Sequence, residues 1–535
     1  MPHVPWVPPF VFGSVTPRLL AGREPRTAAH VAALRQQGVT HVLDLRQPEE
    51  WTGPGRLGAE ALPSLEENSI TRLNVPVEDG GAPTPAAFDR AVAFIQDAFL
   101  QRGTRVYVHC RAGIERTGAV LVAWWAWEHG AAAAESLDAI QRTKPDTAPL
   151  GHQLRAARDW LHSPRPGRTS SRRSRLRGCV LGGAAGDALG APVEFSSLAD
   201  IRARYGPGGI RRYAPAFGQP VAITDDTQMT LFTIEGLVRA SVRGRSKGVC
   251  HPPSVVKLAY WRWLTTQGEF PKETESSPSE GQKPAWTDGW LLQQTVLHAR
   301  RAPGHSCLSA LRSGRFGRPE DPINDSKGCG AVMRGAPVGF VTCANSEQMF
   351  ALGCEIGALT HGHPTGYSAA GALAVIVERL REGETLEAGV RTAIECLARD
   401  ERFAETRRAL ESARGLAGQG DAAAGTVESL GGGWVAEEAL AIAVYAALAA
   451  PNFEEALVLA VNHGGDSDST GAICGNLLGA RDGVFAIPPT LLRDLEAREI
   501  MVQLADDFAL ESTAPPSDDG CGGATDAWLE RYPGW

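Results

Sequence analysis

The sequence predicts two domains of different fold class, an N-terminal α/β domain and a C-terminal all-α domain. Strand and helix patterns alternate in the first part of the chain, whereas nearly every pattern after residue 176 is helical and rich in Ala, Leu and Gly. A segment rich in Pro, Gly, Ser and Arg separates the two parts, and this composition cannot build a core. We therefore expect domains at 1–162 and 177–512, a linker at 163–176 and a tail at 513–535.

Composition excludes several classes of protein. The chain has 535 residues, of which 43% are hydrophobic and 21% charged, as in soluble globular proteins. It has no run of about 18 apolar residues that would span a bilayer, and its N-terminus lacks the layout of a signal peptide. Ten cysteines without regular spacing predict reduced thiols, and the net charge of -8 disfavours nucleic-acid binding. We expect a cytoplasmic protein without a nucleic-acid or membrane partner, and no pattern indicates an oligomeric state.

The α/β domain is predicted from a short series of alternating elements. Gly38 is placed to cap the end of the first helix, and a buried strand follows it directly. The domain closes with a last helical pattern before the linker. In order, the predicted elements are a helix at 28–37, a strand at 40–45, a strand at 105–108, a helix at 117–128 and a helix at 153–161.

The second domain shows apolar residues at helical spacing almost throughout, for example in Ala436–Tyr445. Two segments lack such a pattern. Residues 269–284 are charged and contain three prolines, which predicts a mobile surface loop. The tail after Pro515 is rich in Gly and Asp, and we expect most of it to be poorly ordered.

A first group of chemically informative residues runs from His109 to Gly118. Cys110 ends a predicted strand, Arg116 follows six residues later, and a helix begins at Thr117. A loop between a strand and a helix N-terminus directs backbone N–H groups inward, where they can bind a phosphate dianion. Arg116 can hold two phosphoryl oxygens, and the positive field should lower the pKa of Cys110 to give a nucleophilic thiolate. We expect Thr117 to hydrogen-bond the sulfur, and His109 to order the loop.

A leaving alkoxide needs a proton, and the acidic loop at 76–83 supplies a donor, with Asp79 preferred over Glu78. This loop and the Cys-x5-Arg-Thr segment together resemble the cysteine-based protein phosphatases of dual-specificity type, over about residues 7–162. The resemblance implies a nucleophile, a phosphate-binding arginine, a loop hydroxyl and a general acid, at Cys110, Arg116, Thr117 and Asp79. The alternatives are a buried structural thiol and an inert binding version of the fold.

Two distant segments, Thr224–Thr227 and Gly464–Thr470, carry clustered side-chain oxygens at the start of helical patterns. Helix capping needs one such side chain, whereas crowded carboxylates repel one another unless a cation offsets them. Five acidic groups nearly balance two divalent ions, and all-oxygen ligands favour Mg²⁺ or Mn²⁺ over Zn²⁺. The candidate ligands are Glu194, Thr224, Asp225, Asp226, Asp466, Asp468 and Ser469.

The same motifs resemble the ADP-ribosylglycohydrolase family from about Arg177 to Leu510. The matching blocks occur in family order and are Gly186–Gly190 with Glu194, Thr224–Thr227, Gly328–Arg334, Thr360–His361 and Gly464–Ser469. The resemblance implies an all-α domain and a two-magnesium site formed by the seven candidate ligands. It also implies that ADP-ribose contacts Ser326, Gly328, Cys329, Gly330 and His361. Cys329 departs from the Asn that is frequent in the family, and Ser469 replaces a common Thr.

The sequence therefore predicts a bifunctional hydrolase. One domain would release ADP-ribose from a modified protein or small molecule, with protein arginine as the first acceptor to expect by resemblance, and the other would hydrolyse a phosphomonoester. Two cations would orient the ribose hydroxyls and lower the pKa of a water molecule, while Glu194 or one of the aspartates moves the proton.

The sequence is compatible with three other functions. The chain can be an ADP-ribose-binding regulatory or scaffold protein with an inert phosphatase-like domain. Alternatively, the helical domain regulates an active phosphatase by binding a nucleotide. The fusion also suggests a phosphatase that acts on a phosphorylated ADP-ribose derivative.

Overall fold

The chain forms two compact units, which are Met1–Ser163 and Pro164–Trp535. In this computed structural model the described residues are 10–52, 60–99, 104–129, 131–162, 172–272, 284, 286–419, 423–513, 515–516 and 525–534. The first unit contains a five-stranded sheet with helices, and the second is built from helices, so the predicted fold class is confirmed.

The sheet of the first unit has the strand order β1-β2-β5-β3-β4. β1 pairs with β2 in antiparallel fashion, and the remaining pairs are parallel. Gly22 and Asp44 both lie in register with His109, so three strands end at the same edge of the sheet. The strands are β1 (Phe12–Thr16), β2 (Leu19–Gly22), β3 (His41–Asp44), β4 (Thr71–Asn74) and β5 (Val106–His109).

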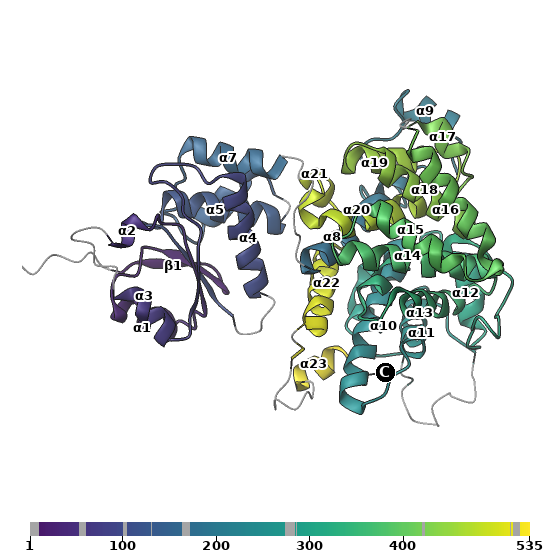
Figure 1. The fold of residues 1–535 in the computed structure, drawn as a ribbon, viewed down its shortest axis with the longest axis horizontal. Coiled ribbons are helices and arrows are strands. Elements are labelled where there is room, and N and C mark those ends of the chain that lie inside the picture. Colours follow the sequence, from purple (N-terminus) through teal and green to yellow (C-terminus); the bar gives the residue numbers. More distant parts are fainter. Residues whose placement is uncertain are drawn as a thin grey trace, which may run out of the picture. The chain divides into compact units, whose positions relative to one another are not determined.

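Helices cover both faces of this sheet, with α1 (Ala28–Gln36) and α3 (Ala61–Glu67) on one face. The opposite face carries α4 (Pro85–Phe99), α5 (Glu115–His129) and α7 (Gly151–His162), as Figure 1 shows. Apolar residues such as Val31 and Leu65 bury the first pair of helices against the strands. The remaining helices of this unit are α2 (Glu49–Thr52) and α6 (Ala133–Gln141).

The described residues of the second unit form helices and no β-strand. α8 and α20 are among the most deeply buried, with every residue of α8 except Arg172 hidden from solvent. The helices are α8 (Arg172–Gly190), α9 (Leu198–Tyr205), α10 (Asp225–Lys247), α11 (Pro252–Thr266), α12 (His305–Arg312), α13 (Ser346–Ala358), α14 (Pro364–Arg381), α15 (Leu386–Leu397), α16 (Ala404–Ala417), α17 (Ala424–Glu428), α18 (Ala436–Ala449), α19 (Phe453–Val461), α20 (Ser467–Asp482), α21 (Pro489–Leu492), α22 (Arg498–Thr513) and α23 (Asp526–Arg531).

Glycines bring α8 and α20 into direct backbone contact. A Cβ atom added at Gly186 would overlap the carbonyl of Gly471, and one added at Gly182 would overlap the carbonyl of Gly475. The same holds for Gly178 of α8, which faces the carbonyl of Gly479. Because these glycines recur every four residues, they lie on one face of each helix. The two antiparallel helices therefore pack more closely than any side chain would allow.

The predicted end of the linker needs a correction. Residues 163–171 of the predicted linker lie outside the described residues, but residues 172–176 belong to α8. The helix extends this far because Arg173 and Arg177 both form ion pairs with Asp506 of α22, at 2.6 and 2.5 Å. A run of arginines that resembles a solvated linker in sequence is therefore partly a buried packing surface.

The tail is also more ordered than its composition predicts. Residues 526–531 form α23, in which Trp528 is buried and donates a hydrogen bond through Nε1 to Glu511 at 2.8 Å. Tyr532 donates to Asp507 at 2.7 Å. The expectation of a poorly ordered tail is therefore wrong for this part. Most of the loop predicted at 269–284 lies outside the described residues.

Among the described residues, no helix combines the length and the apolar character that crossing a membrane requires.

The close contact of α8 and α20 predicts that Gly182→Ala lowers the free energy of unfolding by about 1–3 kcal/mol, because the added methyl group meets fixed backbone rather than a movable side chain. Gly415→Ala in α16 is the matched control, since no heavy atom lies within 4 Å of its Cβ position. It should raise stability by about 0.5–1 kcal/mol through helix propensity. Urea unfolding followed by far-ultraviolet circular dichroism measures both, and equal effects would contradict the account.

Candidate functional sites

The loop between β5 and α5 surrounds the Cys110 sulfur. Cys110 is only 3% exposed, and the Gly113 N–H donates a hydrogen bond to Sγ at 3.3 Å. Gly113 has a φ of +77°, and a Cβ atom at this position would overlap the backbone of Gly22 at the end of β2. Glycine is therefore required for the loop to turn toward the sulfur while touching a neighbouring strand.

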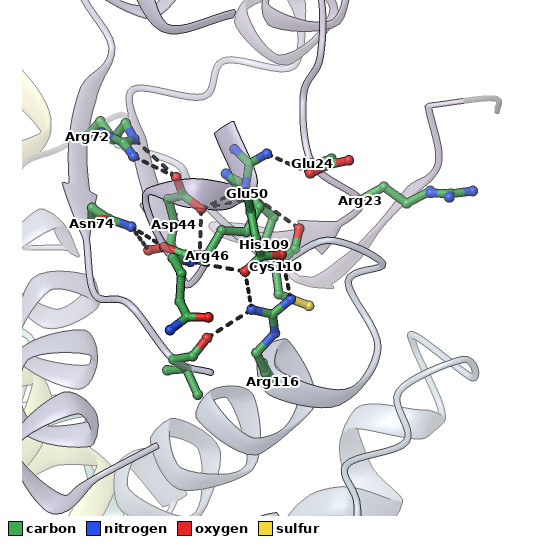
Figure 2. Close-up of polar contacts among 12 residues, drawn as sticks. Arg23, Glu24, Asp44, Arg46, Glu50, Arg72, Asn74, His109, Cys110 and Arg116 are labelled. Atoms are coloured by element: carbon green, nitrogen blue, oxygen red, sulfur yellow. Dashed lines mark hydrogen bonds and ion pairs between the residues drawn. The ribbon is translucent and has the colours of Figure 1, made fainter. Parts of the chain in front are cut away.

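Arg116 is held in a fixed position at the start of α5 (Figure 2). Its guanidinium group binds both carboxylate oxygens of Glu50, at 2.6 and 3.0 Å, and donates to the Val77 carbonyl at 2.9 Å. Burial acts against the charge of Glu50, but the hydrogen bonds from Arg116 lower its pKa. Such a bidentate pair fixes the plane of the guanidinium group.

Glu50 is a site residue that the sequence reasoning missed. It lies in the four-residue helix α2, far from Cys110 in sequence, and no fixed spacing links it to the Cys-x5-Arg motif. Only the fold brings its carboxylate to Arg116.

Asp79, the predicted general acid, lies on the loop between β4 and α4 and is 60% exposed. Its carboxylate forms an ion pair with Nη2 of Arg116 at 2.9 Å, so it faces the Cys110 loop. Side chains of α7 hold this loop in place. His152 Nε2 lies 2.9 Å from the Gly80 carbonyl, and Gln153 donates a hydrogen bond to the Gly81 carbonyl at 2.7 Å. The structure thus brings together the predicted nucleophile, arginine and acid.

His109 and Thr117 support the loop in different ways. His109 Nδ1 lies 3.2 Å from the Cys110 carbonyl, and burial lowers the pKa of His109 to about 4, so the imidazole is neutral near pH 7. This contact is compatible with a role in ordering the loop, which stays a prediction. Thr117 Oγ1 is buried and has no hydrogen-bond partner among the described residues, so the expected bond to the sulfur is not made in this structure.

A buried ion-pair network lies behind this loop, and sequence reasoning did not find it. Asp44, at the end of β3, binds Arg46 at 3.1 Å and Arg72 at 2.7 Å, and His109 lies 3.7 Å from the same carboxylate (Figure 2). Arg46 also stacks on the ring of Trp51, with its Cζ 3.3 Å from the ring centroid. These contacts fix the edge of the sheet from which Cys110 projects.

In the helical unit, three predicted ligands converge. Glu194 lies in the turn after α8, whereas Asp466 and Asp468 lie at the N-terminus of α20. Each offers one carboxylate oxygen, and these oxygens all lie within 4.8 Å of one another. Asp466 also caps the helix, because its Oδ1 accepts a hydrogen bond from the Ser469 N–H at 3.3 Å. Asp466 therefore both caps α20 and belongs to the carboxylate cluster.

The second acidic segment is placed by Asp187 of α8. Its carboxylate accepts hydrogen bonds from the backbone N–H groups of Thr224 and Thr227, at 3.0 and 3.2 Å, and from the Thr227 hydroxyl. These bonds fix the start of α10, where Asp225 and Asp226 follow. Asp187 lies within the glycine-rich motif Gly186–Gly190, whose sequence alone does not indicate this role.

The clustered carboxylates destabilise one another's charges. Burial, followed by the charges of Asp466 and Asp225, raises the pKa of Glu194 to about 8. Burial raises the pKa of Asp225 to about 8 as well. Burial together with neighbouring carboxylates raises the pKa of Asp226 and of Asp468 well above the usual range. A cation at this position would remove that repulsion.

The donors fit a divalent cation. Glu194 Oε2 and Asp226 Oδ1 are buried and lack a hydrogen-bond partner among the described residues. A buried carboxylate oxygen without a partner is costly unless it coordinates a metal or is neutralised. Oxygen donors are the ligands that magnesium and manganese prefer.

The segment predicted to contact ADP-ribose lies beside this cluster. Ser326 Oγ accepts a hydrogen bond from the Gly328 N–H at 3.3 Å, and Cys329 Sγ lies 2.9 Å from Asp466 Oδ2. His361 is only 1% exposed, and Cβ atoms added at Gly328 or Gly330 would touch its ring. Burial lowers its pKa to about 3. His361 thus supports the loop from beneath, rather than presenting a surface to a ligand.

Two exposed aromatic rings border the cluster, and sequence reasoning did not single them out. Phe195 follows Glu194 directly, and its ring stacks on Trp434 with 5.3 Å between centroids and 23° between planes. They are 71% and 43% exposed, unusual values for large apolar side chains. The Trp434 carbonyl accepts a hydrogen bond from the Cys329 N–H at 3.2 Å, which links the rings to the cluster.

Comparison with known proteins identifies the class. The chain belongs to the ADP-ribosylglycohydrolase family, whose family model matches residues 168–517. Residues 20–131 match the model described as a polymorphic toxin system DSP-PTPase phosphatase. Both resemblances seen in the sequence are therefore confirmed, and the chain joins a hydrolase family domain to an N-terminal phosphatase-like domain.

Three relatives each match more than half of this chain. An uncharacterised protein of Archaeoglobus fulgidus is 31% identical over 62% of this chain and 94% of its own length. ADP-ribosyl-[dinitrogen reductase] glycohydrolase of Rhodospirillum rubrum is 26% identical, over 61% and 91%. ADP-ribosylarginine hydrolase Tri1 of Serratia proteamaculans is 25% identical, over 68% and 87%.

Proposed function

We propose that this chain is a bifunctional hydrolase that removes ADP-ribose from a modified acceptor and hydrolyses a phosphomonoester. The observation that carries the first activity is the meeting of Glu194, Asp466 and Asp468 within 4.8 Å, from segments far apart in the sequence. Membership in the ADP-ribosylglycohydrolase family supports the same reading.

The cofactor in this proposal is a pair of Mg²⁺ ions, with Mn²⁺ as a substitute. The unpartnered buried carboxylate oxygens and the raised pKa values of the neighbouring aspartates support a site that binds ions of high positive charge. When bound, the ions supply charge that orients ribose hydroxyls and acidifies water. The proposed ligands are Glu194, Thr224, Asp225, Asp226, Asp466, Asp468 and Ser469.

Among the three clustered carboxylates, Glu194 is the one that is not fully buried. We assign it the proton transfer at the glycosidic bond for that reason, because it alone among the three is partly accessible to a substrate. The other carboxylates face the positive charge that develops on the ribose as the bond breaks. Phe195 and Trp434 offer flat apolar faces on which a purine base can stack.

Protein arginine is the first acceptor to test. The support is the relative from Serratia proteamaculans, whose name describes an ADP-ribosylarginine hydrolase. Ser326, Gly328, Cys329 and Gly330 are proposed to line the ADP-ribose site, with His361 beneath them.

The second proposed activity belongs to the N-terminal unit. Cys110 attacks phosphorus, its sulfur forming a bond as the leaving oxygen departs, and Asp79 gives that oxygen a proton. Arg116 holds the phosphoryl oxygens. The position of Asp79 supports its role as the proton donor, because its carboxylate pairs with Arg116 at 2.9 Å and therefore lies next to the Cys110 loop.

Millimolar Mg²⁺ is expected to raise the unfolding temperature of the helical unit, since a ligand at 100 times its Kd contributes about 2.7 kcal/mol. Asp226→Asn should be more stable than the parent without Mg²⁺, because the cost of burying an ionisable carboxyl group among other carboxylates is lost, and should gain less from Mg²⁺. Thermal unfolding with Mg²⁺ and with a chelator measures both effects. Asp321→Asn, an exposed residue in the same unit, is the control. An undiminished Mg²⁺ effect in Asp226→Asn would refute the proposed ligand set.

Asp466→Asn and Asp468→Asn should each slow ADP-ribose release from an ADP-ribosylated arginine peptide by about 100-fold or more, because several kcal/mol of charge stabilisation is removed. Chromatographic measurement of free ADP-ribose follows the rate, with Asp321→Asn again as the control. Full activity of both variants in magnesium would contradict the proposal. Release from serine-linked but not from arginine-linked ADP-ribose would refute only the acceptor.

Cys110→Ser should abolish hydrolysis of p-nitrophenyl phosphate, whereas Cys343→Ser, a partly exposed cysteine of the other unit, should leave it unchanged. Glu50→Gln should lower kcat/KM by about tenfold, equivalent to about 1.4 kcal/mol, because Arg116 loses a charged partner. Steady-state kinetics test both. A parent protein without phosphatase activity would favour the inert, regulatory alternative for this unit.

A further inference from the structure

A buried lysine lies against the Cys110 loop, and the proposed reaction has not used it. Lys144 follows α6 in the chain, and its side chain is only 3% exposed. Its Nζ donates a hydrogen bond to the Gly113 carbonyl at 3.0 Å and pairs with the exposed carboxylate of Asp146 at 2.8 Å. Burial of an ammonium group costs free energy unless the group is paired. The buried partner here is a carbonyl group of the loop that surrounds the nucleophile.

The segment that carries Lys144 is held between the sheet and the loop. A Cβ atom added at Gly13 of β1 would lie 3.5 Å from Lys144 Cγ, so the aliphatic part of the side chain packs on this strand. On the loop side, the Ala148 N–H donates to the Ile114 carbonyl at 3.4 Å. This segment therefore binds two successive loop carbonyls, those of Gly113 and Ile114.

The contact with the Gly113 carbonyl determines where the next N–H group points. The C=O and N–H groups of a planar trans peptide unit point in opposite directions, so the Ile114 N–H points away from the lysine. The Gly113 N–H donates to Cys110 Sγ at 3.3 Å. Because Gly113 has a left-handed backbone conformation, successive N–H groups of the loop can face one anion-binding concavity.

The Ile114 N–H has no acceptor among the described residues. A backbone donor at a loop that closes around a nucleophile is therefore left for a bound molecule. The lysine lies on the other end of the same peptide unit, where it binds the carbonyl oxygen.

We infer that Lys144 is a positioning residue of the N-terminal unit, which holds the Gly113–Ile114 peptide so that its N–H group binds a tetrahedral dianion. The inference rests on the proposed phosphatase activity, whose substrate carries such a group. The ammonium group also polarises the carbonyl that it binds, which makes the N–H of the same peptide a stronger donor. Arg116 binds the phosphoryl oxygens directly, whereas Lys144 acts through the backbone.

Three substitutions separate this role from a purely structural one. Lys144→Met removes the ammonium group and keeps an unbranched side chain of similar length. Lys144→Arg keeps a cationic donor. Asp146→Asn is the matched control, because it removes the charged partner of Lys144 and leaves the contact with the Gly113 carbonyl. Circular dichroism establishes that each variant is folded.

The first measurement is the binding of tungstate, an unreactive tetrahedral dianion, to the full chain by isothermal titration calorimetry. Lys144→Met should bind tungstate about tenfold more weakly than the parent, the effect of one hydrogen bond to a charged group. Lys144→Arg and Asp146→Asn should stay within about threefold of the parent, because the carbonyl contact is kept.

The second measurement is nuclear magnetic resonance of the full chain with ¹⁵N-labelled isoleucine. The Ile114 amide proton should move downfield when tungstate binds, because its N–H then donates to an anion. Ile114→Val identifies the resonance. This measurement uses the parent side chain at position 144, so it decides the question even where Lys144→Met does not fold.

Equal tungstate affinity in folded Lys144→Met and in the parent would overturn the inference, and so would an Ile114 resonance that tungstate leaves in place. An equal loss of affinity in Asp146→Asn would also overturn it, because the ion pair rather than the carbonyl contact would then matter. Neither measurement requires turnover. A parent protein that binds tungstate as expected but does not hydrolyse p-nitrophenyl phosphate would refute the proposed phosphatase activity and leave the role of Lys144 standing.

Discussion

The helical unit depends on the direct backbone contact between α8 and α20. Glycines at four-residue spacing allow the helices to approach until carbonyl groups lie where side chains would otherwise be. The two helices run in opposite directions, so the end of α8 lies beside the start of α20, where Gly190 faces Ser467. Glu194 and Asp466 meet for this reason, since each lies just beyond the glycine face. The close packing of the two helices therefore holds these two carboxylates near each other in spite of their mutual repulsion.

A similar constraint operates on a smaller scale in the N-terminal unit. Gly113 lies against Gly22, so the Cys110 loop rests directly on the end of a strand. Buried ion pairs around Asp44 hold that edge of the sheet, and Glu50 holds Arg116. In both units, glycines allow two backbone segments to come into direct contact. A carboxylate that binds the backbone or an arginine then fixes the orientation of the neighbouring site residues.

The sequence predicts the fold class and the local motifs well, because Cys-x5-Arg and the Asp-rich helix starts are dense signals within a few residues. It does not predict Glu50, whose partner lies 66 positions away. Strands β1 and β4 lie at the two edges of the sheet and are only partly buried, so they lack the continuous apolar run that predicts the equally short central strands β3 and β5. The tail helix was missed because its stability comes from Trp528 and Tyr532 binding distant acids, which composition does not record.

The central claim is that carboxylates from distant segments form one cation centre beneath an ADP-ribosyl bond. A crystal structure of the full chain with Mn²⁺ and ADP-ribose, with anomalous scattering to locate the metal, tests it most directly. The account predicts two manganese peaks among Glu194, Asp226, Asp466 and Asp468, with the ribose next to them. Manganese bound elsewhere, or ADP-ribose bound away from these residues, would contradict it.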